Sequence, residues 1–299
     1  MTPFTSPRPA NRAPATRGLP PPPQPATVPA TVMTWNLWSS PTDRAQRAQP
    51  IAATVEQHRP DVLAIQEAWT SPDATRAHDG NVAADPVTAL ARLLGHHRVA
   101  HHDPDAPGRG LGLCSRWPIT DPRVLALPAG DAPAEHRAAL TGVLDTPAGG
   151  LPVYVTHLNW RLDHGRIRRA QLRHILTDID ARHHDGPLPA VICGDLNADA
   201  DAEEIRMLTG LAHPDPPGLV LHDAWTASGL TGPGHTWTHA NPYAAHERLG
   251  NARLDYVFVV WRPGARAPVT GARVIPGVED GVWASDHSAV LAHLELHAS

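Results

Sequence analysis

The segment Trp283-Ala284-Ser285-Asp286-His287 lies close to the end of this 299-residue sequence and places an acid beside an imidazole. Other short polar segments occur upstream, mostly at or just past the end of an apolar run. They are Thr34-Trp35-Asn36, Ile65-Gln66-Glu67, Thr156-His157-Leu158-Asn159, Gly194-Asp195-Leu196-Asn197 and Arg253-Leu254-Asp255-Tyr256. Short apolar runs bounded in this way are typical of buried strands. The set predicts one functional site assembled from distant parts of the chain.

Periodicity places helices and strands in both halves of the chain. The predicted helices cover 43–58, 86–94, 166–179 and 201–209, and the predicted strands cover 30–38, 61–67, 111–115, 137–144, 152–158, 190–193, 254–260, 269–275 and 288–294. Asp85 and Gly95 are placed to cap the second helix, and Pro50 predicts a kink or a start in the first. Two clusters of strands with interspersed helices favour an α/β fold of two packed sheets covered by helices on each side.

Composition favours one domain of ordinary core size. Hydrophobic residues make up 41% of the chain, and nothing between residues 31 and 297 has the character of a linker. Residues 1–30 are rich in proline and predict a disordered or polyproline-II tail, so we expect a single domain over 31–299.

The charged residues exclude several chemistries. All 25 basic residues are arginine, which rules out a Schiff base, a lysine general base and a lysine-dependent P-loop. The net charge of −5 gives no overall field that attracts nucleic acid or acidic membranes.

The chain lacks the apolar core of a signal peptide and a run long enough to span a membrane. Cys114 and Cys193 lie in apolar runs, as expected for buried thiols, and we expect a cytoplasmic protein.

The candidate site residues each have a functional and a structural interpretation. Glu67 ends an apolar strand, where a carboxylate either binds a cation or pairs with an arginine. Asp195 and Asn197 are two apart, which puts both on one face of a strand end if the strand continues, or else forms an Asx turn. Their hard oxygen atoms suit Mg²⁺ or Mn²⁺ better than zinc.

Asp286-His287 is either a reactive pair or an ordinary surface pair. Asp255 enters an otherwise apolar strand, and a buried Asp beside a His would fix the imidazole tautomer and raise its basicity. His157 is one of 20 histidines, for which a core or surface role is the default. The histidine pairs at 96–97 and 101–102 lack the spacing of a metal site.

Taken together, these segments resemble the endonuclease/exonuclease/phosphatase superfamily, and the resemblance runs from about Val32 to Leu296. Its carriers are Thr34-Trp35-Asn36-Leu37, Gln66-Glu67, Thr156-His157-Leu158, Gly194-Asp195-Leu196-Asn197, Arg253-Leu254-Asp255-Tyr256, Ser285-Asp286-His287 and the strand-like Gly112 to Ile119. The resemblance implies a four-layer α/β/β/α sandwich of two mixed β-sheets flanked by helices. It also implies a site at the open end of the two sheets.

The resemblance also assigns roles. It implies that Glu67 is the principal ligand of Mg²⁺ or Mn²⁺, supported by Asn36 and Asp286. His287 resembles the general base, with Asp255 holding its imidazole. His157 resembles a donor that stabilises the transition state, and Asp195 with Asn197 resembles the pair that orients water and the phosphoryl oxygens. The implied activity is phosphodiester hydrolysis by in-line attack of a His-activated water.

Other functions remain open at this point. The same fold could be a catalytically silent binding module, a DNA-specific nuclease or, less in keeping with the spacing, a zinc hydrolase. The negative charge favours a small phosphoester or a phospholipid headgroup over duplex DNA. The loop at 228–250 is a candidate for substrate selection. Arg168, on the apolar face of the helix at 166–179, is expected to reach the site or to pair with a buried carboxylate.

Overall fold

The computed structural model describes residues 27–70, 81–103, 108–132, 135–246, 249–261 and 267–297. The first strand begins at Thr27 rather than at the predicted domain start, residue 31, because Thr27 to Ala30 pair with the last strand of the chain. The predicted boundary is therefore corrected to residue 27 or earlier. The rest of the predicted tail, residues 1–26, lies outside the described residues.

The first sheet joins strands from both ends of the chain in the order β11-β14-β1-β2-β4-β3. Its members are β1 (Thr27–Asn36), β2 (Val62–Ala68), β3 (His97–His101), β4 (Gly110–Ser115), β11 (Val269–Ile275) and β14 (Ala289–His297). Only β1 and β2 pair in parallel; the other neighbours are antiparallel. The chain therefore leaves β1 and β2 at the same end of the sheet.

The second sheet repeats this arrangement in the order β5-β6-β7-β8-β10-β9. Its members are β5 (Ile119–Ala126), β6 (Ala138–Thr146), β7 (Gly149–His157), β8 (Val191–Asp195), β9 (Val220–Asp223) and β10 (Asp255–Trp261). Here β7 and β8 form the parallel pair, and β10 runs antiparallel to β8. A small hairpin, β12 (Val278–Glu279) with β13 (Val282–Trp283), precedes β14.

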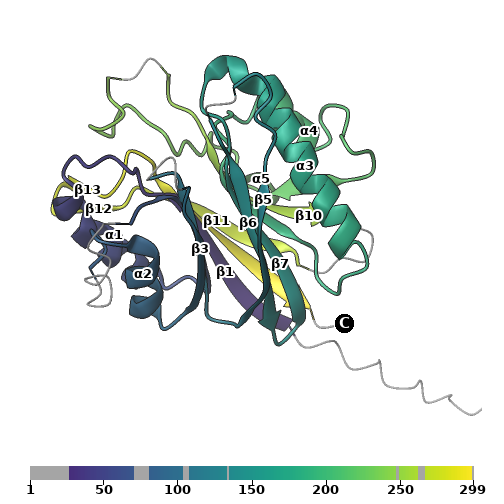
Figure 1. The fold of residues 1–299 in the computed structure, drawn as a ribbon, viewed down its shortest axis with the longest axis horizontal. Helices are drawn as coiled ribbons and strands as arrows, with labels where there is room; N and C mark the ends of the chain where they lie inside the picture. The colour runs from purple at the N-terminus through teal and green to yellow at the C-terminus, as the bar shows by residue number, and fades with distance from the viewer. Residues whose placement is uncertain are drawn as a thin grey trace, which may run out of the picture.

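Helices cover the outer faces of both sheets (Figure 1). They are α1 (Arg44–His58), α2 (Pro86–Leu94), α3 (Gly165–His183) and α4 (Glu203–Leu208). The short α5 (Ala224–Ala227) instead contacts β10 of one sheet and β11 of the other. Three apolar cores separate the layers: one between α1, α2 and the first sheet, one between the two sheets, and one between the second sheet, α3 and α4. The predicted α/β/β/α sandwich is confirmed.

Local signals explain where α2 begins and ends. The Asp85 side chain accepts from the backbone N–H of Thr88, Pro86 occupies the first turn, and Gly95 ends α2 in the left-handed region. By contrast, α1 runs from Arg44 through Pro50 without a new start. Its apolar side packs on the first sheet, and this burial stabilises the helix despite the proline.

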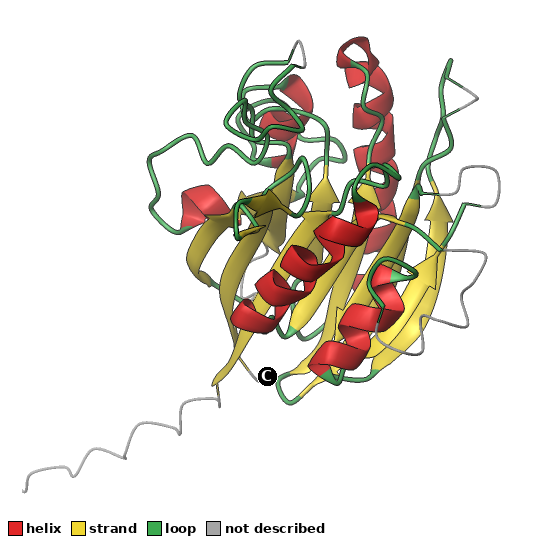
Figure 2. Cartoon of the chain, turned by 90° about the vertical axis from the view of Figure 1, so that its left-hand side faces the viewer, coloured by secondary structure: helices red, strands yellow, loops and turns green. Residues whose placement is uncertain are grey.

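Loops gather at the end of the sandwich opposite the C-terminus (Figure 2). This is the end where β1, β2, β7 and β8 finish and where β10 and β14 begin. Cys114 and Cys193 are buried free thiols, as expected. Within the described part of the chain, no helix is long and apolar enough to cross a membrane.

Candidate active site

Asn36 and Glu67 come from the parallel pair in the first sheet. Asn36 is the last residue of β1 and is buried, whereas Glu67 lies at a bulge near the end of β2. Glu67 has a φ of 54°, in the left-handed region, so its backbone leaves the strand geometry at this point. The bulge turns the carboxylate out of the apolar ladder and into a polar cleft.

The Glu67 carboxylate is held by three hydrogen bonds. Its Oε2 accepts from the backbone N–H and the hydroxyl of Ser39, each at 2.8 Å, and its Oε1 accepts from Nδ2 of Asn36 at 3.1 Å. The predicted alternative of a salt bridge to arginine is not what the structure shows. Neutral donors hold this carboxylate in place, and among the described residues no arginine forms an ion pair with it.

His157 and Asp195 come from the parallel pair in the second sheet, where they lie opposite each other. Their Nε2 and Oδ2 atoms are 3.4 Å apart. Gly194 makes this close pairing sterically accessible: it has a φ of 151°, and a Cβ placed there would lie 1.9 Å from the backbone oxygen of Thr156. A side chain at residue 194 would separate the two strands.

Asp195 and Asn197 face the same cleft through a turn and not through strand alternation. The strand ends at Asp195, and Asn197 has a φ of 51°. Oδ1 of Asp195 accepts the backbone N–H of Asn197 at 2.9 Å, while Nδ2 of Asn197 donates to the backbone oxygen of Leu158 at 3.0 Å. This is the Asx turn that the sequence left open, and it still delivers both side chains to the cleft.

His287 and Asp255 form a buried pair. Nδ1 of His287 lies 2.8 Å from Oδ2 of Asp255, and Nε2 of His287 lies 3.7 Å from Oδ2 of Asp195. Asp255 stands opposite Asp195 in the ladder between β10 and β8. The edge of the Trp237 ring packs against His287, with ring centroids 4.9 Å apart. The imidazole is thus oriented from one side by a carboxylate and from the other by an indole.

The segment before β14 is fastened to β1. The hydroxyl of Ser285 donates to the backbone oxygen of Asn36 at 2.6 Å, and Nε1 of Trp35 donates to the backbone oxygen of His287 at 3.0 Å. The backbone N–H of His287 donates to the Ser285 hydroxyl at 3.2 Å. These bonds fix Asp286 and His287 against the end of the first sheet.

Asn36 connects the two sheets. Its Nδ2 donates to Oε1 of Glu67 and also, at 2.9 Å, to Oδ2 of Asp195. One amide therefore sets the spacing between a carboxylate of the first sheet and a carboxylate of the second. All three groups are wholly or partly buried, so loss of these two hydrogen bonds would leave buried polar atoms unpaired and would cost folding free energy.

The predicted site residues meet around one cleft of about 660 Å³. Six of them line it, namely Glu67, His157, Asp195, Asn197, Asp286 and His287. Asn36 and Asp255 lie behind this lining, hydrogen-bonded to members of it. The rest of the wall includes Trp38, Arg137, Trp160, Leu162, Trp237 and His246. The structure therefore brings all eight predicted residues together.

Burial and mutual repulsion raise the pKa of two aspartates in this cleft. Burial, with the charges of Glu67 and Asp195, raises the pKa of Asp286 to about 7 against the attraction of His287. Burial, together with the charge of Asp255, raises the pKa of Asp195 to about 7, again opposed by His287. In the absence of a cation, both acids hold protons more tightly than ordinary aspartates do.

The pKa values of the two imidazoles in the cleft, His157 and His287, are shifted in opposite directions. Burial would lower the pKa of His287, but the carboxylates of Asp255 and Asp195 outweigh it and raise the pKa well above its usual value. Burial lowers the pKa of His157 well below its usual value, and the positive charge of Arg137 acts in the same direction. The neighbouring carboxylates thus raise the proton affinity of His287, as a base requires, whereas His157 is a neutral hydrogen-bonding group.

Two sets of residues could hold a cation. Glu67 and Asp286 offer carboxylates to the cleft, with Asn36 behind them. Asp195, Asp255 and His287 have donor atoms within 4.8 Å of one another. In this second set the hydrogen bond to Asp255 already occupies Nδ1 of His287, so the set behaves as an acid–base pair beside a carboxylate.

Some residues of the cleft were not singled out from the sequence. Arg137 precedes β6, is buried, and donates through Nε and Nη2 to Oε1 of Glu135. The signal that could have identified it is an arginine placed just before an apolar strand. Arg168 realises one of its two predicted alternatives: its Nε lies 2.6 Å from Oε1 of the buried Glu204, and it does not line the cleft.

Comparison with known proteins agrees with this architecture. The chain belongs to the Endonuclease/Exonuclease/phosphatase family, whose model matches residues 33–287. Proteins of this family depend on a divalent metal and typically hydrolyse phosphoester bonds. A comparison with curated proteins finds none that matches.

Solved structures share the fold at low sequence identity. An endonuclease/exonuclease/phosphatase from Bacteroides vulgatus is 18% identical with a TM-score of 0.69, covering 90% of this chain and 100% of its own. TDP2 of D. rerio, complexed with a single strand DNA product, is 19% identical with a TM-score of 0.68, covering 89% and 98%. TDP2 from C. elegans is 18% identical with a TM-score of 0.68, covering 89% and 75%.

Proposed function

We propose that this chain hydrolyses phosphodiesters with the help of a divalent cation, Mg²⁺ or Mn²⁺, and that His287 acts as the general base. One observation carries the proposal: the buried hydrogen bond of 2.8 Å between His287 and Asp255 opens onto a cleft that also contains Glu67 and Asp286. A base oriented by a carboxylate, next to two further acids, is the arrangement that water activation at a phosphoester requires.

Glu67, Asn36 and Asp286 form the proposed cation site. The carboxylates of Glu67 and Asp286 offer oxygens, which Mg²⁺ and Mn²⁺ prefer, while Asn36 and Ser39 hold the Glu67 carboxylate in one orientation. The repulsion between Asp286 and Glu67 is a charge imbalance that a cation would offset. When bound, such an ion neutralises charge on the phosphoryl oxygens.

The other residues position the reacting groups. Asp255 keeps a proton on Nδ1 of His287, so that Nε2 is the atom that accepts a proton from water. His157, neutral and within reach of Asp195, is proposed to donate a hydrogen bond to the phosphoryl group. Asp195 and Asn197, held by their Asx turn, are proposed to orient the water and the phosphoryl oxygens.

The substrate class is a phosphodiester with an apolar or ring-bearing neighbour group. Trp160 and Leu162 line the cleft and are 59% and 72% exposed, which offers a stacking surface beside the polar centre. The related structure of TDP2 with a single strand DNA product makes single-stranded DNA a candidate alongside small phosphoesters and phospholipid headgroups. The charge-based preference against duplex DNA stays a prediction.

The test is hydrolysis of bis-p-nitrophenyl phosphate with Mg²⁺, Mn²⁺ or EDTA. We expect turnover that requires the metal and falls by at least about 100-fold in His287→Ala. His184→Ala is the matched control, since His184 also bonds an aspartate, Asp180, but lies exposed just after the end of α3. Turnover that persists in EDTA or in His287→Ala would overturn the proposal. Inactivity towards this ester, single-stranded DNA and glycerophosphodiesters alike would favour a silent binding module.

A further inference from the structure

Arg47 is a buried arginine at the junction of the β1–α1 loop and the segment that precedes β14. It lies in the first turn of α1 and is 0% exposed. A guanidinium has five N–H groups, and each can donate one hydrogen bond. Those of Arg47 donate to the backbone oxygens of Leu37 at 2.8 Å, Trp38 at 2.9 Å, Ser40 at 2.8 Å, Thr42 at 3.2 Å and Ala284 at 3.1 Å. One side chain therefore joins two segments that are far apart in the sequence.

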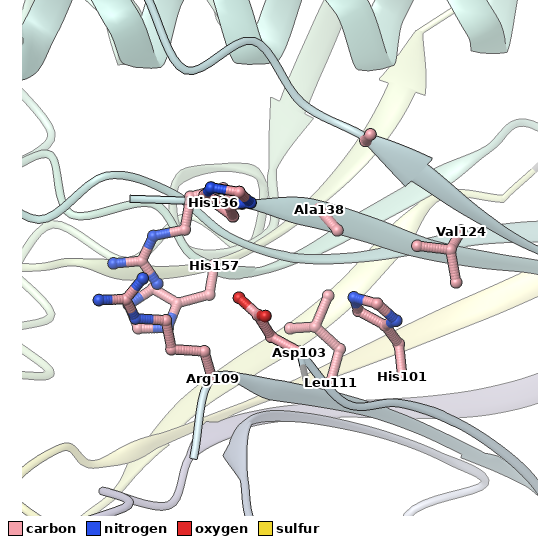
Figure 3. A pocket seen from close by; sticks show the side chains of 10 residues that line it. His101, Asp103, Arg109, Leu111, Val124, His136, Ala138 and His157 are labelled. Carbon is pink, nitrogen blue, oxygen red and sulfur yellow. The ribbon is translucent and has the colours of Figure 1, made fainter. Parts of the chain in front are cut away.

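This use of a guanidinium differs from that of the arginines that line cavities. Arg137 pairs with Glu135 and lines both the catalytic cleft and a neighbouring cavity of about 260 Å³. Figure 3 shows Arg109 and His157 at one end of that cavity. Arg47 lines neither cavity, and its hydrogen bonds within the described part of the chain all go to backbone oxygens. Its contacts are therefore with the chain and not with a ligand.

The loop that Arg47 holds supports the Glu67 carboxylate. Ser39 lies between two residues whose carbonyl groups accept from Arg47, and its backbone N–H and hydroxyl each donate to Oε2 of Glu67 at 2.8 Å. Trp38 has a φ of 55°, in the left-handed region that residues with a side chain rarely adopt. Such a conformation persists where the surrounding contacts fix it. The two bonds from Nη2 of Arg47, on either side of Ser39, are contacts of this kind.

The fifth bond connects the same guanidinium to the segment that carries Asp286. Its acceptor, the backbone oxygen of Ala284, lies two residues before Asp286. Burial lowers the pKa of Arg47, and the carboxylates of Asp286 and Glu67 are among the groups that oppose this shift, so the buried charge acts on both acids. A positive charge in this place repels a cation, whereas a firm hold on the supports of its ligands favours cation binding. These two effects have opposite signs, and an experiment can separate them.

We propose that Arg47 is a positioning residue for the cation site. By holding the backbone on both sides of Ser39 and at Ala284, it keeps the carboxylates of Glu67 and Asp286 at the spacing that a divalent cation needs. The inference rests on the proposed function, which assigns these two acids as ligands. The hold outweighs the repulsion, because the guanidinium already faces the partial negative charges of five backbone oxygens. Arg47 thus raises the affinity for a cation although its own charge is positive.

Calorimetric titration with Mn²⁺ tests this hold without any turnover. Arg47→Lys keeps the charge but loses the planar fork, so it should weaken Mn²⁺ binding about 10–100-fold. The matched control is Arg168→Lys, which also replaces a buried arginine in the first turn of a helix, one that donates to the backbone oxygens of Asn159 and Arg161. The control should bind Mn²⁺ within about threefold of the wild type. Equal Mn²⁺ affinities for the two variants would overturn the inference.

Two further variants test how Arg47 acts. Ser39→Ala should weaken Mn²⁺ binding at least about tenfold, and its effect should not add to that of Arg47→Lys, so the double variant should bind within about threefold of Arg47→Lys. Full additivity would refute the route through Ser39 and overturn the inference. Arg47→Met, which removes the charge as well, should also bind Mn²⁺ more weakly than the wild type. Tighter binding in Arg47→Met would show that repulsion dominates, against the inference.

Hydrogen exchange in the wild type guards against a folding defect in the Arg47 variants. If Arg47 holds the loop before a cation binds, the backbone N–H of Ser39 should exchange in EDTA at least about 100-fold more slowly than in an unfolded peptide. Exchange at the peptide rate in EDTA, with protection only after Mn²⁺ is added, would show that the cation orders the loop. The positioning role would then be wrong.

Hydrolysis separates this inference from the proposed function. A wild type that binds Mn²⁺ with the expected dependence on Arg47, but hydrolyses none of the phosphodiesters named above, would refute the proposed function alone. Metal-dependent hydrolysis in the wild type, together with an unchanged Mn²⁺ affinity in Arg47→Lys, would refute the positioning role alone.

Discussion

The imidazole of His287 and the carboxylate of Asp255 are in contact at 2.8 Å, and their side chains are only 6% and 0% exposed. The two residues are 32 positions apart in the sequence, yet they form one buried hydrogen-bonded pair. The contact directs Nε2 of His287 towards Asp195 and the cleft. Asp255, the first residue of β10, therefore fixes the orientation of the His287 ring.

Replacing Asp255 by asparagine should lower kcat by about 10²–10⁴-fold with a smaller effect on KM, because the amide no longer selects the tautomer that leaves Nε2 free. Steady-state kinetics on bis-p-nitrophenyl phosphate measure this. The control is Asp180→Asn, which alters the exposed Asp180–His184 pair at the end of α3. A normal kcat in Asp255→Asn would refute the orienting role.

Calorimetric titration with Mn²⁺ distinguishes the two candidate cation sites. If Glu67 and Asp286 hold the ion, Glu67→Gln should weaken Mn²⁺ binding at least about tenfold, while Asp255→Asn should leave it within about threefold. The exposed Glu56→Gln serves as the control. The reverse pattern would place the cation on Asp195, Asp255 and His287 instead.

Above about pH 6.5, the metal-free protein should become less stable as the pH rises. Asp195 and Asp286 titrate near pH 7 in the folded chain but near 3.8 when unfolded, so the folded protein binds more protons between these values. Their contribution is complete below about pH 4 and is lost towards pH 7. Below about pH 6.5 it is opposed by histidines whose pKa is lowered by burial, among them His96 and His157. The raised pKa of His287 extends the decrease above pH 6.5.

Urea unfolding in EDTA at pH 5, 6, 7 and 8 measures this slope. Asp286→Asn should flatten it, because the amide does not titrate, whereas Asp201→Asn on the exposed surface should not. Mn²⁺ should restore stability at pH 8 by replacing the protons. The same pH dependence of stability in Asp286→Asn and Asp201→Asn would contradict this account.

Two neighbouring arginines on α3 should differ in their effect on stability. Arg168 pairs with Glu204, and both side chains are 5% exposed, whereas Arg169 pairs with Glu203 at the surface. Arg168→Met leaves a buried carboxylate without its partner and should cost about 3–5 kcal/mol of unfolding free energy. Arg169→Met should cost less than about 1 kcal/mol. Equal costs in urea unfolding would contradict this account.

Local signals in the sequence predicted most of the fold. The helix at 86–94 and the strand at 269–275 have the bounds that were expected, since caps and apolar runs act over a few residues. The strands β3 and β5 were not individually predicted. Both are edge strands with exposed polar side chains, and β5 contains Pro122, which an edge strand tolerates. Their shape depends on the neighbouring strand more than on their own sequence.

The sequence predicted which residues form the candidate site, but not the hydrogen bonds that connect them. Strand ends gave the positions of Glu67 and Asp195, because a carboxylate after an apolar run must leave the core. The bond from Asn36 to Asp195 joins two sheets, and it depends on how the sheets pack. No periodicity in the chain encodes that distance. The same holds for Arg137, whose place in two cavities becomes evident only once β6 lies beside β7.

The position of β14 between β1 and β11 has a consequence for biosynthesis. This strand comes from residues 289–297, yet it pairs with the first strand of the chain along most of its length. During translation the sheet therefore stays open until these residues have left the ribosome. Asp286 and His287 can therefore reach Asn36, and the predicted site can be complete, only after residue 297 has left the ribosome.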